Sequence, residues 1–152
     1  MVALPFCHLR LKATGTNPDY PKSLSTLGEQ VRKRRLDLQL KREEVSLQLG
    51  VSPETLTNWE MGRREPQPES IPAIIRFLSY DPFPEPGSFG ERLSQERMRR
   101  GLSRRGLGAL VRVDKARLGR WEEGRSKPSP IVAGRIATFF GWSESDPLVI
   151  DG

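Results

Sequence analysis

Apolar residues in this sequence recur at intervals of three to five positions, and the stretches between them are polar. Between residues 27 and 78 they fall into four groups, which are Leu27, Val31 and Leu36, then Val45 and Leu49, then Leu56 and Trp59, then Ile71, Ile74, Ile75 and Leu78. Each group lies on one face of a helix, because an α-helix turns once in 3.6 residues. β-type alternation is not visible in the sequence. The pattern therefore predicts four helices.

The breaks between these helices contain residues that favour helix ends. Gly50 can adopt a positive φ after the second helix, and Gly62 can do so after the third. Ser52 can cap the third helix, with Pro53 at its first position. We therefore expect a short turn of Gly50, Val51 and Ser52 between the second and third helices.

The same segment occurs twice. A shift of 62 positions pairs residues 27–78 with 89–140 without a gap, and 15 of the 52 pairs are identical. In the second copy Asp114 replaces the Ser52 cap and Gly124 matches Gly62. Two copies predict two small all-α domains of one fold, with four to five helices each. The expected division is an N-terminal arm at 1–26, domains at 27–80 and 89–142, a Pro-rich linker at 81–88 and an acidic tail at 143–152.

The linker contains Pro82, Pro84 and Pro86, which prevent helix formation and predict an extended, fairly stiff connector. About 50 residues form only a thin hydrophobic core, so we expect the domains to pack on each other or the protein to dimerise.

Charge and composition narrow the range of functions. The chain has a net charge of +6, and residues 89–140 alone carry +8, which favours a polyanionic partner. One cysteine, Cys7, and one histidine, His8, cannot form a disulfide framework or a protein-only zinc site. We expect no metal, no cofactor and no enzymatic activity. Because no run of about 18 apolar residues occurs, we expect a soluble, cytoplasmic protein without membrane contact.

Two short helices joined by a Gly-Val-Ser turn have the layout of a helix-turn-helix, whose second helix enters the DNA major groove. The small residues Ser46 and Gly108 would let the two helices approach closely. The segments LGVSPETLTNWEMGRREP and VRVDKARLGRWEEGRSKP resemble the turn, recognition helix and basic loop of the lambda-repressor-like family of phage repressors, Cro proteins and xenobiotic-response-element regulators. The resemblance covers both copies.

The resemblance implies roles for particular residues. Base-reading positions lie at the start of the recognition helix and one turn later, which in the first copy are Pro53, Glu54, Thr55 and Asn58, and in the second Lys115, Ala116, Arg117 and Arg120. Phosphate contacts fall at the start of the preceding helix and in the following loop, at Lys41, Arg42, Arg63, Arg64, Ser103, Arg104, Arg125 and Lys127. For Lys115, Arg117 and Arg120, the alternative is a solvated, charged helix face.

Other matched residues have structural readings. The resemblance implies that Arg35 with Glu60, and Arg97 with Glu122, link the first helix to the end of the recognition helix. Trp59 and Trp121 have the spacing of core residues.

The copies also differ. Arg112 stands where the first copy has Gly50, so an arginine is expected in the left-handed conformation. Pro53 and Glu54 predict that the first copy reads DNA weakly or not at all.

These observations predict a sequence-specific regulator of double-stranded DNA, by default a repressor, of bacterial nucleoid or phage type. A single chain would act as a pseudo-dimer, or two chains as a homodimer. The alternatives are an antitoxin-like interaction module, with a protein partner at the first repeat or the C-terminal tail, and a non-specific DNA or RNA binder.

Overall fold

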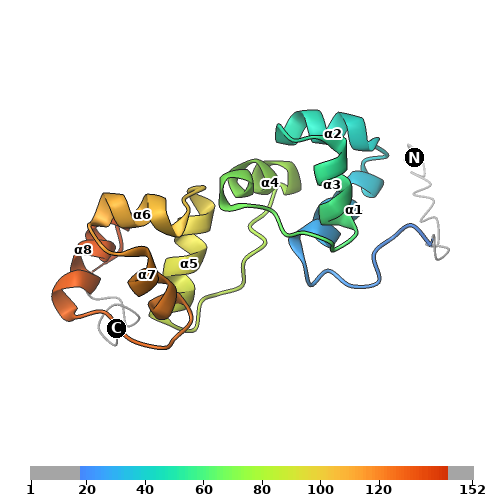
Figure 1. Cartoon of the computed structure of the whole chain (residues 1–152). Coiled ribbons are helices and arrows are strands. Elements are labelled where there is room, and N and C mark those ends of the chain that lie inside the picture. The colour runs from blue at the N-terminus through green and yellow to red at the C-terminus, as the bar shows by residue number, and fades with distance from the viewer. Residues whose placement is uncertain (1–17, 144–152) are drawn as a thin grey trace, which may run out of the picture.

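The computed structural model describes residues 18–143, and every regular element in this range is a helix (Figure 1). This confirms the all-α prediction. The helices of the first repeat are α1 (Leu27–Asp37), α2 (Arg42–Leu49), α3 (Pro53–Glu60), the 3₁₀ turn η1 (Pro68–Ser70) and α4 (Ile71–Leu78). Those of the second are α5 (Phe89–Arg99), α6 (Arg104–Val111), α7 (Lys115–Glu122) and α8 (Pro130–Phe140). Cys7, His8, most of the predicted arm and nearly all of the acidic tail lie outside the described residues.

Helix boundaries follow the capping residues. The Ser52 hydroxyl accepts a hydrogen bond from the backbone N–H of Thr55, and Pro53 is the first residue of α3. Gly50 has a φ of 69° and Gly62 a φ of 68°, as predicted for these two turns. Asp114 caps α7 by accepting from the N–H of Ala116 at 2.8 Å.

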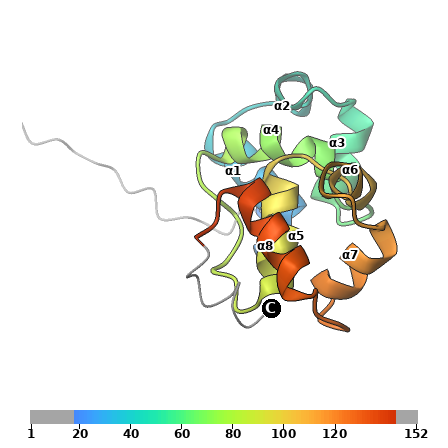
Figure 2. The same cartoon turned by 90° about the vertical axis from the view of Figure 1, so that its left-hand side faces the viewer.

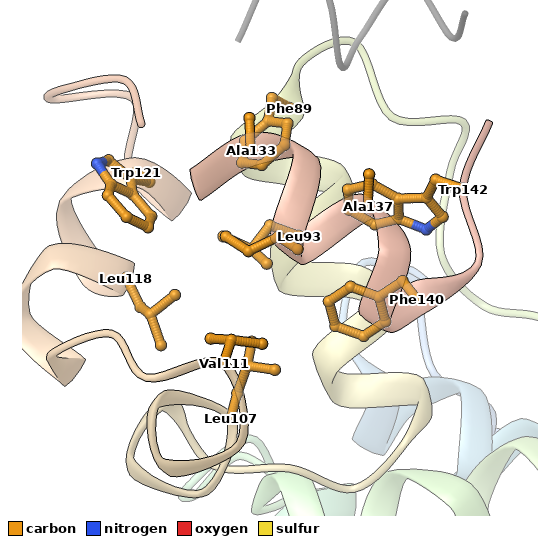
Figure 3. Close-up of a cluster of buried hydrophobic side chains, with 11 residues drawn as sticks. Phe89, Leu93, Leu107, Val111, Leu118, Trp121, Ala133, Ala137, Phe140 and Trp142 are labelled. Carbon is orange, nitrogen blue, oxygen red and sulfur yellow. The ribbon is translucent and has the colours of Figure 1, made fainter. Parts of the chain in front are cut away.

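Each repeat has its own hydrophobic core. The first consists of Val31, Val45, Leu49, Leu56, Trp59, Ile71, Ile74, Phe77 and Leu78. The second consists of Phe89, Leu93, Leu107, Val111, Leu118, Trp121, Ala133, Ile136, Ala137, Phe140 and Trp142 (Figure 3). Trp59 and Trp121 are both buried, which confirms their predicted packing role.

Two matched glycines allow the first and third helices of each repeat to touch. A methyl group on Gly28 would overlap the carbonyl group of Trp59, and one on Gly90 would overlap the carbonyl group of Trp121. The recognition helix is thereby held directly on the backbone of the first helix.

The two repeats also contact each other, as expected from their thin cores. Both α4 and η1 lie against α5. Met98 of α5 and Phe83 of the non-helical connector pack on the core of the first repeat. Arg99 lies over the Phe83 ring, 5.3 Å from its centroid, and forms an ion pair of 2.7 Å with Asp81.

Candidate nucleic-acid interface

The turn between α6 and α7 is tight because Gly108 has no side chain and Arg112 adopts a left-handed backbone conformation. An added methyl group on Gly108 would overlap the carbonyl oxygen of Val113, so the absence of a side chain permits this approach. Arg112 ends α6 in the left-handed conformation, with φ 55° and ψ 49°. This confirms the expected backbone of Arg112, whose counterpart is Gly50.

Helix α7 has one buried and one exposed face. Leu118 and Trp121 point into the second core (Figure 3), and Gly119 is buried beside them. The predicted base-reading residues are all exposed on the rest of the helix surface, namely Lys115, Ala116, Arg117 and Arg120. Within residues 18–143, no ion pair engages the guanidinium groups of Arg117 and Arg120. Their donors are therefore free to approach a ligand.

Helix α3 offers a less cationic surface at the same positions. Glu54 is exposed, whereas Thr55 and Asn58 are partly buried. The Thr55 hydroxyl lies 2.9 Å from that of Ser52, so it is already hydrogen-bonded within the cap. The start of α3 thus presents the carboxylate of Glu54 and a Thr55 hydroxyl that is already hydrogen-bonded.

A buried carboxylate joins three helices in each repeat. Glu60 accepts from Nε of Arg35 at 2.6 Å and from Nε of Arg42 at 2.9 Å. Glu122 accepts equivalently from Arg97 at 2.6 Å and from Arg104 at 2.8 Å. The predicted pairs of first helix and recognition helix are therefore present, and each contains a second arginine.

That second arginine is also a predicted phosphate ligand. The side chains of Arg42 and Arg104 are 40% and 42% exposed, so each guanidinium group is anchored by Nε and still reaches the surface. The hydrogen bond to Glu122 raises the pKa of Arg104 above its ordinary value, against an opposing effect of burial. A permanently charged, positioned guanidinium group is suited to a phosphate oxygen.

The remaining predicted phosphate ligands occupy exposed or capping positions. Arg63, Arg64, Arg125 and Lys127 are exposed in the loops after the recognition helices, and Lys41 is exposed before α2. Arg125 lies 3.1 Å from a carboxylate oxygen of Glu123. The Ser103 hydroxyl caps α6 by accepting from the N–H of Gly106 at 3.0 Å.

Two further cations at this surface, Arg105 and Arg112, are not among the predicted DNA contacts, although the backbone of Arg112 was predicted. Arg105 and Arg112 line a shallow hollow of about 410 Å³ beside the α6–α7 turn, together with Lys115. Comparing the copies would have revealed the cluster, because the first repeat has Glu43, Gly50 and Pro53 at these three positions. All three differences add positive charge to the second repeat.

Comparison with known proteins agrees with this geometry. Residues 88–147 match the family model described as a helix-turn-helix domain, and residues 31–83 match another described as helix-turn-helix. A search of curated proteins found no match, and a search of solved structures found none either.

The described residues contain neither a candidate membrane span nor a candidate metal site. No helix between residues 18 and 143 is long and apolar enough to span a membrane. Over the same range, no group of three or more His, Cys, Asp or Glu residues is placed to hold a metal ion.

The matched domains indicate a DNA-binding regulator, and such families are typically non-enzymatic. The two matches follow one another along the chain and include both helix-turn-helix units described above. The chain is therefore a tandem helix-turn-helix protein, with two domains consistent with the lambda-repressor-like family.

Proposed function

We propose that this protein is a sequence-specific, double-stranded DNA-binding transcriptional repressor that inserts α7 into the major groove and blocks polymerase. One observation carries the proposal. Lys115, Arg117 and Arg120 lie exposed along α7, while the other face of that helix is fixed in the core by Leu118 and Trp121. A rigidly held helix with outward donors can select base edges, because discrimination depends on the position of those donors.

The side chains of α7 suit particular bases. Arg117 and Arg120 can each donate two hydrogen bonds to O6 and N7 of guanine, and the methyl group of Ala116 suits contact with a thymine methyl. Lys115 lies at the helix start. Ser103, Arg104, Arg125 and Lys127 would contact phosphates and set the register without reading sequence.

The first domain is the weaker reader in this proposal. Thr55 and Asn58 supply its polar groups, while Glu54 faces phosphates unfavourably unless it accepts from N4 of a cytosine. Lys41, Arg42, Arg63 and Arg64 would hold the backbone. The chain would act in the cytoplasm, on the nucleoid or on phage DNA.

Selection of bound fragments from random duplex DNA, at about 0.15 M salt, tests the proposal. A recovered consensus supports it. Equal affinity for all duplexes would indicate a non-specific binder instead, and no duplex binding together with a stoichiometric protein partner over Thr55 and Asn58 would indicate an interaction module.

Two variants separate reading from positioning on the selected site. Arg117→Ala should cost about 1–3 kcal/mol and relax the preference at one base pair. Arg104→Ala should weaken all sequences alike and reduce the slope of log affinity against log salt by about one. Because Arg104 also contacts Glu122, the unfolding curve of this variant must be measured alongside its binding. Identical behaviour of the two variants would refute the assignment.

A further inference from the structure

We infer that a single chain reads two unlike half-sites arranged in the same direction along the duplex, rather than as an inverted repeat. The inference rests on the proposed function and specifies the architecture of its DNA site. It comes from the way in which the two repeats contact each other.

The contact joins non-equivalent helices. By the shift of 62 positions, α5 is the counterpart of α1, and α8 is the counterpart of α4. The first repeat contributes α4 and η1, whereas the second contributes α5. Met98 extends from α5 onto the first core, and a methyl group on Gly101 would lie 3.1 Å from Cγ of Pro72.

A two-fold axis would require this contact to occur twice. If α4 lies on α5, then α8 would have to lie on α1. Figure 1 shows α8 and α1 at opposite ends of the molecule. Gly134, the counterpart of Pro72, agrees with this, because a methyl group added there would meet nothing within 4 Å. The contact is therefore of the head-to-tail kind, which no two-fold axis generates.

The residues at the counterpart positions also differ. Gln39 stands where the second repeat has Gly101, and Leu36 where it has Met98. Gln39 nonetheless has a φ of 56°, close to the 67° of Gly101. The side chain, rather than the backbone, thus distinguishes the contacting surface from its counterpart.

This symmetry constrains the DNA. The two halves of an inverted repeat are related by a two-fold axis, so two domains reading them must be related by the same axis. The two repeats are not. Figure 2 shows α3 and α7 towards the same, right-hand side of the molecule, so both recognition helices lie on one side of it. Head-to-tail domains on one side of a duplex match half-sites that follow each other in one orientation.

The test uses the full chain and the site recovered by selection. Arg117→Ala and Asn58→Ala identify the base pairs read by each domain, and probes are then built with the two half-sites in the same or in opposite orientation at a range of spacings. We expect one same-orientation spacing to bind at least about tenfold more tightly than every inverted probe, with one chain per duplex. An inverted probe bound equally well, a chain that needs only one half-site, or two chains on an inverted repeat would overturn the inference. Absence of any sequence preference would instead refute the proposed function.

An interface variant and its matched control test the contact itself. Gly101→Gln introduces the side chain that the first repeat has at the counterpart position, where Gln39 already adopts a similar backbone conformation. This variant should reduce the orientation preference to less than about threefold. Gln39→Gly makes the reverse change at the exposed counterpart and should leave the preference intact. Binding to each isolated half-site and the circular dichroism spectrum should be unchanged in both. A Gly101→Gln protein that folds and keeps the full preference would contradict the role of this contact.

Discussion

Arg97 and Glu122 form a two-pronged ion pair, with Nε to Oε1 at 2.6 Å and Nη2 to Oε2 at 2.9 Å. The two side chains are 4% and 2% exposed. A further N–H of Arg97 donates to the carbonyl oxygen of Leu102 at 2.8 Å. The pair thus fixes the end of the recognition helix against the first helix and the loop that follows it.

Removing the charge of Glu122 should strongly destabilise the second domain. Glu122→Gln leaves a buried arginine without its counter-charge, and such losses cost about 3–5 kcal/mol. We expect the urea unfolding of the full chain, followed by circular dichroism, to show a loss of this size in one domain.

Glu123→Gln is the matched control for this variant. Its carboxylate is 40% exposed and pairs at the surface with Arg125 and with Arg104, so its loss should cost less than about 1 kcal/mol. Equal effects of the two changes would show that burial of Glu122 contributes nothing to the pair.

A methyl group should have opposite effects at two glycines of the second domain. Gly90→Ala would force α5 away from the backbone of α7 at Trp121, and we expect it to lower the free energy of unfolding by at least about 2 kcal/mol. Gly134→Ala meets open space within α8 and should raise it by about 0.5–1 kcal/mol. Thermal unfolding of the two variants and the parent distinguishes these outcomes, and destabilisation by both would argue against the described approach of α5 and α7.

Local features of the fold could be predicted from the sequence because single residues determine them. Gly50, Ser52 and Asp114 act through their own backbone or the next turn, so the ends of α2, α3 and α7 followed from residue type. The repeat strengthened these predictions, since two copies had to adopt one structure. The ion pairs at Glu60 and Glu122 were available only through the family resemblance.

The contact between the repeats could not be predicted in the same way. Helical spacing places the apolar side chain of Met98 on one face of α5, but it does not indicate which of the two cores this face packs against. The hydrogen bonds of Arg42 to Glu60 and of Arg104 to Glu122 could not be predicted for the same reason. Each arginine reaches a glutamate 18 positions away only because the start of one helix lies beside the end of the next.

Acid should weaken the start of α1 in a defined pH range. Hydrogen bonds from Ser23 and from the backbone N–H of Thr26 lower the pKa of Glu29 from 4.5 to about 2. Because the folded state has the lower pKa, the ionised carboxylate stabilises it fully above pH 4.5, and this contribution disappears as the pH falls through about 2. We expect Glu29→Gln to remove this part of the pH dependence of the thermal midpoint.

Ser23→Ala checks the cause of that effect. Loss of the 2.8 Å hydrogen bond to Glu29 should raise the pKa of the carboxyl and move the acid-induced loss to higher pH. A profile identical to that of the parent would exclude Ser23 as the main cause.

Replacing Arg112 with glycine should improve folding and impair DNA binding. An L-residue such as Arg112 in the left-handed conformation costs about 1–2 kcal/mol, which glycine would avoid. Glycine also gives the unfolded chain more freedom, which offsets part of this gain, so Arg112→Gly should stabilise the fold by about 0.5–1 kcal/mol. The same change removes one of three cations around the hollow beside α7, and the slope of log affinity against log salt should fall by about 0.9 if Arg112 contacts one phosphate.

Gly50→Arg, the reverse change in the first repeat, should destabilise by a similar amount. Unfolding curves and a salt titration of duplex binding measure both quantities. A variant that is stabilised with unchanged binding would show that Arg112 is merely strained, whereas the expected opposite signs would show that its strain is retained for contact with DNA.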